Sequence, residues 1–343
     1  MPLSRVLSNP VGGFVDRILR GVGQVMLQNN PITGLLFLLG IFINDWVSGL
    51  YALLGTVVST ETALLFGAPD NDVRQGLYGF NGTLIGLGLT LYLRHDAILL
   101  IYVIVASMFA AVVTAAIQDI FGAQGHALTA PFVIMTWIFI AAVFVYGRLH
   151  GAPALGTPHL LTEATPAAAA FAPIDALTGI LNGLAQVMLQ QNIWTGVIFL
   201  IALAVNSRIS CAAAVLGSAI AVGVAWSLGA APSAIREGLY GFNAVLTAIA
   251  LGGLFFLLHR TTVLLAILGV CVSTILYGGL VTVLSPLGLP ALTAPFVVTT
   301  WLCLLARVSL TRLQALSPAA AMTPEGNLTA ARQAASERQQ GRL

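Results

Sequence analysis

Long apolar runs separated by short polar breaks fill most of this chain. A helix needs roughly 20 apolar residues to cross the hydrocarbon of a bilayer, so these runs predict membrane spans. They cover residues 33–45, 47–67, 76–93, 97–118 and 128–147 in the first half, and 194–205, 209–230, 238–258, 262–284 and 291–307 in the second. The pattern predicts an all-α polytopic membrane protein with five spans in each half.

A shorter, more mixed segment precedes each set of spans. These segments are Phe14–Asn29 and Leu177–Gln191. They are too short and too polar for ordinary spans. Non-spanning helices at membrane depth are tolerated where they line a cavity, so we expect a tilted half-membrane helix in each half.

Three blocks of sequence occur twice, in the same order. GLYGFN begins at Gly76 and again at Gly238, 162 residues later (238 − 76). GQVMLQNNPITG at Gly23 matches AQVMLQQNIWTG at Ala185, again at 162 (185 − 23). ALTAPFVIMTW at Ala127 matches ALTAPFVVTTW at Ala291, at 164 (291 − 127). Such spacing indicates a tandem duplication.

The duplication divides the chain into four parts. We expect a first repeat at 1–147, a Pro- and Ala-rich linker at 148–172, a second repeat at 173–312 and a polar tail at 313–343, which is disordered or a short helix. Five spans per repeat would insert the second repeat upside down relative to the first. Inverted repeats place a solute path where the two halves meet.

The charges predict the orientation. Arginines gather near both ends of the chain: Arg5, Arg17, Arg20, Arg307, Arg312, Arg332, Arg338 and Arg342. Basic residues mark the cytoplasmic side of a membrane, so we expect both termini there.

Composition narrows the class of protein. Charged residues make up 8% of the chain, against roughly 25% in soluble domains. The net charge of +2 does not suggest a nucleic-acid partner. Cys211, Cys271 and Cys303 lie inside apolar runs without CxxC spacing, and no phosphate-binding loop or catalytic motif occurs, so we expect no metal, cofactor or enzymatic activity.

The repeated polar residues are neutral. They are Gln24 and Gln186, Asn81 and Asn243, and Thr129 and Thr293. A buried amide or hydroxyl without a partner is costly, so these groups face protein or an aqueous path. One interpretation is a path for a small, uncharged, planar solute rich in N–H donors. The alternatives are interhelical hydrogen bonds for the Gln and Thr pairs, and clasps to the backbone for the Asn pair.

Proline and histidine mark the third block. Pro131 and Pro295 lack an N–H, so we expect each to open its helix and free backbone carbonyls. His126 immediately precedes the first copy of this block. We interpret it as a histidine at the membrane interface, with pH gating as the alternative.

These motifs resemble the urea transporter family, whose signature is Leu-Pro-x-x-Thr-x-Pro-Phe. LPALTAPF at Leu289–Phe296 fits it fully, and GHALTAPF at Gly125–Phe132 keeps the Thr, Pro and Phe but has Gly125 and His126 in place of Leu-Pro. The resemblance covers roughly residues 13–307. It implies a homotrimer in a cell (inner or plasma) membrane, with a pore in each protomer that conducts urea passively.

The resemblance also implies the site residues. Gln24 and Gln186 would bind urea at two outer sites, and Thr129 and Thr293 would form the central constriction. Some bacterial relatives have Glu at one outer position, where this chain has Gln at both. The walls of the slot would be Phe80, Phe242, Leu84, Leu246, Val25, Val187, Leu27 and Leu189.

Other functions stay open at this point. The same repeats would suit a channel for other small neutral amides, for ammonia or for water. A membrane-embedded enzyme would need a convergent acid, base or metal cluster, which the spans lack. A scaffold or receptor would have no use for matched Gln and Thr residues at matched depth.

Overall fold

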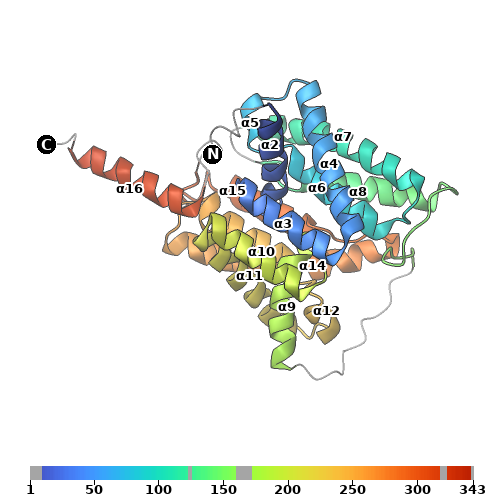
Figure 1. Ribbon diagram of the computed structural model, residues 1–343. Coiled ribbons are helices and arrows are strands. Elements are labelled where there is room, and N and C mark those ends of the chain that lie inside the picture. The colour runs from blue at the N-terminus through green and yellow to red at the C-terminus, as the bar shows by residue number, and fades with distance from the viewer. Residues whose placement is uncertain (1–9, 123–125, 160–171, 317–322, 341–343) are drawn as a thin grey trace.

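Helices build this protein in the computed structural model, which describes residues 10–122, 126–159, 172–316 and 323–340 (Figure 1). Arg5, Gly125, Arg342 and residues 160–171 of the expected linker lie outside the described residues. The first half contains α2 (Pro10–Gln24), α3 (Pro31–Asn44), α4 (Trp46–Leu65), α5 (Asp70–Arg74), α6 (Gly79–Tyr92), α7 (Ala97–Phe121), α8 (Ala130–Ala141) and the short 3-10 helix η2 (Ala142–Phe144).

The second half follows the same order of elements. It contains α9 (Pro173–Gln186), α10 (Ile193–Asn206), α11 (Arg208–Ser227), α12 (Pro232–Arg236), α13 (Gly241–Ile249), the π-helical turn η3 (Ala250–Leu254), α14 (Arg260–Leu284), η4 (Ser285–Leu287) and α15 (Ala294–Ala306). A further helix, α16 (Pro324–Gln340), projects from the body (Figure 1). The expected tail is therefore helical from Pro324 to Gln340.

Helix lengths differ from the expected spans. By length and composition, four helices of the described chain are long enough to cross a membrane: α4, α7, α11 and α14 with its extension to Leu287. The runs expected at 33–45, 76–93 and 128–147 form α3, α6 and α8, of 14, 14 and 12 residues. A 14-residue helix is only about 21 Å long. Apolar residues just before α6 and α8 lengthen the runs without being helical.

Side-chain caps explain where several helices begin. The Asn30 side chain accepts hydrogen bonds from the Ile32 and Thr33 N–H groups, and Pro31 occupies the first turn of α3. Asn192 caps α10 in the same way. These caps satisfy N–H groups that have no partner inside the helix. The half-membrane helix expected at 14–29 therefore ends at Gln24, and the chain reverses before Asn30.

Pro131 and Pro295 begin helices rather than opening them. Each lies in the first turn, of α8 and of α15. A proline at that position removes an N–H that would have no partner in the helix anyway. The expectation that these prolines interrupt a span is wrong, because the helix starts one residue before them.

The two halves meet through reciprocal contacts of α3 and α10, which lie side by side (Figure 1). Thr33 Oγ1 donates to the Ala202 carbonyl at 2.9 Å, and Thr195 Oγ1 donates to the Gly40 carbonyl at 3.1 Å. Thr195 and Ala202 are the residues 162 positions after Thr33 and Gly40 (195 − 33, 202 − 40). The same bond is thus made twice with the halves exchanged, as in an isologous dimer.

Other pairs repeat this reciprocity. The rings of Phe37 and Phe199, also 162 residues apart (199 − 37), meet edge to face with centroids 4.9 Å apart. Asn44 donates to Gln190 and Asn206 donates to Gln28, both at 2.8 Å. These pairs join the halves into one hydrophobic core that contains buried residues of both.

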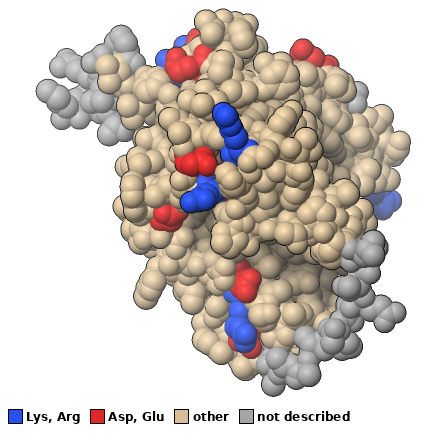
Figure 2. Space-filling view, turned by 90° about the vertical axis from the view of Figure 1, so that its right-hand side faces the viewer, with Lys and Arg blue, Asp and Glu red and all other residues tan. Residues whose placement is uncertain are grey.

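The outer surface is mostly uncharged. Figure 2 shows one face on which basic and acidic side chains are few and most atoms belong to other residues. Large apolar side chains stand exposed on outward-facing helices, among them Leu35, Leu39, Ile101, Phe109, Leu264 and Leu268. Contiguous exposed apolar surface is unfavourable in water and suits contact with lipid.

Candidate functional site

Gln24 lies at the end of α2, where its amide is held in one orientation. Its Nε2 donates to the Gln75 carbonyl at 3.0 Å. Because that partner is a carbonyl, the amide must present its NH₂ group to it. No described residue donates to the Gln24 Oε1, so this oxygen remains an acceptor on the cavity that Gln24 lines.

Gln186 repeats this arrangement at the end of α9. Its Nε2 donates to the Glu237 carbonyl, again at 3.0 Å. Gln75 and Glu237 each lie one residue before their copy of GLYGFN. Each repeat therefore fixes one glutamine so that its oxygen is left to accept a hydrogen bond from a solute.

The cavity at Gln24 is small, about 70 Å³. Leu27 and Phe80 line it from the first half, and Leu254 and Phe255 line it from the second. The His126 ring stacks on Phe255, with centroids 4.5 Å apart and planes at 21°. This stack between the halves narrows the cavity.

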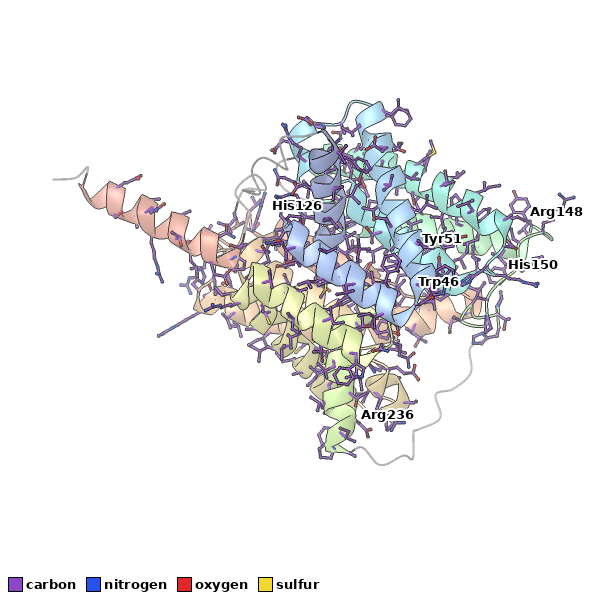
Figure 3. The ribbon with its side chains drawn as sticks, viewed as in Figure 1. Trp46, Tyr51, His126, Arg148, His150 and Arg236 are labelled. Carbon is purple, nitrogen blue, oxygen red and sulfur yellow. The ribbon has the colours of Figure 1, made fainter. Side chains whose placement is uncertain are left out.

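A hollow of about 630 Å³ lies next to this small cavity. The two share Gln75, Leu77, Gln118 and His126, so these side chains stand between them. His126 lies in the connection between α7 and α8 (Figure 3). Burial, with the positive charge of Arg307, lowers the pKa of His126 from 6.5 to about 4. The ring is therefore neutral at pH 7.

The cavity at Gln186 is larger, about 420 Å³. Leu189 and Phe242 line it at the positions that Leu27 and Phe80 hold in the first half. Glu237 also lines it, whereas Gln75 holds the corresponding position in the small cavity. A carboxylate is thus present at this cavity although both outer positions are glutamine.

Thr129 and Thr293 lie between the two cavities. Thr293 Oγ1 donates to Thr129 Oγ1 at 2.7 Å, and both residues are 2% exposed. The preceding residues are Leu128, which lines the small cavity, and Leu292, which lines the large one. Each of the two bonded threonines therefore directly follows, in the sequence, a leucine that lines one of the two cavities.

Asn81 and Asn243 hold the threonine segments in place. Asn81 Nδ2 donates to the Leu128 carbonyl at 3.2 Å, and its Oδ1 accepts from the Phe132 N–H at 3.0 Å. Asn243 makes the same two bonds to Leu292 and Phe296, at 3.1 and 3.0 Å. These asparagines are clasps to the backbone, as one of the sequence interpretations has it.

The remaining predicted wall residues are core residues here. Val25, Val187, Leu84 and Leu246 are at most 1% exposed and belong to the main hydrophobic cluster. None of them lines either cavity. The structure thus brings Gln24, Leu27 and Phe80 to one cavity and Gln186, Leu189 and Phe242 to the other.

The sequence interpretation missed several residues that line the cavities. Leu254 ends η3 and Phe255 follows it, whereas Tyr92 ends α6 and Tyr277 lies within α14. Gln75 and Glu237 were missed as well. Their position directly before the repeated GLYGFN was a signal that could have identified them. Nothing in the local sequence marks Tyr277.

No three His, Cys, Asp or Glu side chains of the described chain lie close enough together to hold a metal ion. The polar groups at the two cavities are amides, hydroxyls, the His126 ring at the small cavity and the Glu237 carboxylate at the large one. Such an arrangement offers hydrogen bonds to a solute and no paired acid and base.

Comparisons with known proteins agree on one family. The family model described as "Urea transporter" matches residues 15–308. The chain is 32% identical over 300 residues to urea transporter 1 of Capra hircus and 33% identical over 301 residues to urea transporter 1 of Rattus norvegicus. Both matches cover 85% of this chain and 77% of the relative.

Proposed function

This chain belongs to the urea transporter family, and we propose that urea crosses it passively along a path between its two halves. The observation that carries the path is the position of the bonded Thr129 and Thr293, one residue from a cavity on each side. The cavities hold Gln24 and Gln186, whose oxygens are left as acceptors.

The proposed route has three positions at which urea would contact polar groups. Urea would give an N–H to the Gln24 or Gln186 oxygen in the outer cavities, and would pass the threonine hydroxyls at the centre. The slot walls would be Phe80, Phe242, Leu27 and Leu189, with Leu84, Leu246, Val25 and Val187 packed behind them, which their burial supports. The Thr129–Thr293 bond would open as urea takes its place.

Energetics favour a neutral, flat solute on this route. Exchanging a bond to water for a bond to protein changes the free energy by only about 1 kcal/mol, so urea would pass without deep traps. An ion would lose its hydration without adequate compensation at the apolar centre. Transport would therefore need no coupled sodium or proton gradient, and we propose no enzymatic role.

The membrane arrangement belongs to the proposal as well. The reciprocal bonds of Thr33 and Thr195 support a pseudo-twofold axis between the halves. We propose that this axis lies in the membrane plane, which would make the repeats inverted and put both termini on the cytoplasmic side of the cell (inner or plasma) membrane. The family resemblance supports a homotrimer with one path in each protomer.

Urea uptake into proteoliposomes tests the proposal. Stopped-flow light scattering under an inward urea gradient, without ion gradients, should show flux well above that of empty vesicles. Thr129→Val and Thr293→Val should each lower it. Thr274→Val is the matched control, because Thr274 is also 2% exposed and its hydroxyl bonds within its own helix, to Val270. Urea flux equal to that of empty vesicles from a folded preparation would refute the function. A solute series of amides, ammonia and water separates urea from the alternative permeants.

A further inference from the structure

The two cavities differ in their hydroxyl groups. Tyr92, at the end of α6, and Tyr277, on α14, both line the cavity at Gln186. The π-helical turn η3 shifts the register of the second half by one residue, so Phe255 is the counterpart of Tyr92 (255 − 92 = 163) and lines the small cavity instead. The phenol at this position therefore exists at one end of the path and is replaced by an apolar side chain at the other.

The position that corresponds to Tyr277 in the first half also lacks a phenol. Helices α7 and α14 have 25 residues each and start 163 positions apart (260 − 97), so Tyr277 corresponds to Thr114. The Thr114 side chain is fully buried, and its hydroxyl donates to the Ala110 carbonyl of its own helix at 2.8 Å. The first half thus offers no free hydroxyl there.

Both phenols are available to a solute. No described residue is hydrogen-bonded to the hydroxyl of Tyr92 or Tyr277, and neither oxygen is among the fully buried polar atoms that lack a partner. An unpaired hydroxyl that is not fully buried, on a residue that lines a cavity, is reachable from that cavity. A phenol O–H donates well to a carbonyl oxygen.

Aromatic contacts fix the position of Tyr277. Its ring meets Tyr240 edge to face at 5.4 Å between centroids, and Phe242 at 5.6 Å. Tyr92 is anchored through its backbone, whose carbonyl accepts from the Ala152 N–H at 2.8 Å. Side chains that are already fixed in position lose little conformational entropy when they bind a ligand, which favours binding of a solute here.

The same cavity holds the complementary acceptors. The Gln186 oxygen and the Glu237 carboxylate accept hydrogen bonds and cannot serve the oxygen of a urea-like solute. Urea has N–H donors on one side and a carbonyl acceptor on the other. Gln191 and Ser285 also carry donor groups at this cavity, but Gln191 is exposed and the Ser285 hydroxyl donates to the Thr282 carbonyl at 3.4 Å. The two phenols add unpaired donors for the urea carbonyl.

We propose that Tyr92 and Tyr277 form a carbonyl-binding pair at the Gln186 end of the path, whose hydroxyls donate to the oxygen of urea and related amides. This inference rests on the proposed function and specifies how its larger cavity recognises the solute. It makes binding asymmetric, because the small cavity has no phenol at either corresponding position.

Thiourea is the probe that tests this pair. It has the shape and N–H groups of urea, but its sulfur is a weaker acceptor. In proteoliposomes, Tyr92→Phe and Tyr277→Phe should each lower the ratio of urea to thiourea flux about three- to tenfold, as expected for one lost neutral hydrogen bond. Each variant keeps its ring, and the two residues lie on different helices, so one variant can substitute for the other if folding fails.

Tyr240→Phe is the matched control, because Tyr240 contacts Tyr277 but does not line the cavity, and its flux ratio should equal that of the wild type. An unchanged ratio in folded Tyr92 and Tyr277 variants would overturn the proposed pair. An equal fall in both fluxes would also overturn it, since that result indicates altered shape. Absence of urea flux in the wild-type protein would count against the proposed function instead.

Discussion

Thr129 and Thr293 hold the same position in the two halves of the chain and are hydrogen-bonded to each other, with 2.7 Å between their hydroxyl oxygens. Both hydroxyls are buried, so each is the principal partner of the other. A residue that contacts its own counterpart must lie on the axis that relates the halves. At the centre of the proposed path, the two repeats therefore contribute the same chemical group.

This bond leads to a non-additive effect on stability. Thr129→Val or Thr293→Val alone leaves one buried hydroxyl unpaired, which should lower the free energy of unfolding by about 1–3 kcal/mol. The double variant should cost little more than one single variant, because both partners are then apolar and of similar volume. Thermal unfolding in detergent measures this cycle. Strictly additive losses would show that the hydroxyls do not depend on each other.

Asn81 supports a second prediction. Asn81→Ala would strip partners from the Leu128 carbonyl and the Phe132 N–H, which lie in the buried segment around Thr129. We expect a loss of at least about 2 kcal/mol in unfolding free energy, and a lower urea flux because Thr129 is no longer positioned.

Asn71→Ala provides the comparison for this experiment, because Asn71 is exposed and should tolerate the change. Denaturation and flux are measured on the same preparations. Normal stability of Asn81→Ala would mean that the segment holds its shape without the clasp.

His126 gives a pH prediction with a definite sign. Its pKa is about 4 in the folded chain, against 6.5 in the unfolded chain. Between these values the unfolded state binds more protons, so stability falls as the pH drops from about 6.5 to 4 and this contribution changes no further below 4. The full loss is up to about 3 kcal/mol.

Melting temperatures across this pH range, compared with His126→Gln, measure the contribution of His126. The variant should show a flatter profile. Urea flux should stay constant from pH 8 to 6, because the ring remains neutral there. A midpoint of activity near pH 6.5 that disappears in His126→Gln would contradict this assignment and support the gating alternative.

The fourth prediction concerns Phe255, whose ring limits the size of the small cavity. Phe255→Ala removes the ring that stacks on His126 and should enlarge the space beside Gln24. We expect methylurea flux to rise about threefold, a change in barrier of less than 1 kcal/mol, with a smaller gain for urea.

Leu93 directly follows Tyr92, the counterpart of Phe255 in the first half, and lines neither cavity, so Leu93→Ala should not change the ratio of the two solutes. Flux is measured by the same swelling assay. Equal methylurea flux in wild type and Phe255→Ala would place the narrowest point elsewhere.

Much of this architecture follows from the sequence. The apolar runs predict the helices, and the repeated blocks predict which residues correspond, such as Gln24 and Gln186, which the structure shows in matched bonds. These features depend on local composition and on self-similarity, both of which a single sequence contains.

The rest depends on contacts between distant residues. The short α8 begins where it does because Asn81 binds the chain on both sides of Thr129. Tyr92 and Tyr277 meet in one cavity only after two helices have packed. Leu27 and Leu128 adopt left-handed backbone angles, with φ of 61° and 50°, which leucine rarely does without tertiary support. Periodicity cannot reveal such arrangements.

The reciprocal bonds of α3 and α10 have a consequence for each half alone. Thr33 and Gly40 belong to one helix, and each bonds to the counterpart of the other. Phe37, between them, meets its own counterpart. The surface that residues 1–147 present to their neighbour is therefore self-complementary. Two molecules of that fragment possess the contacts to pair with each other. Producing the chain as two separate halves would therefore measure how far the covalent link between them favours pairing of unlike halves over pairing of like halves.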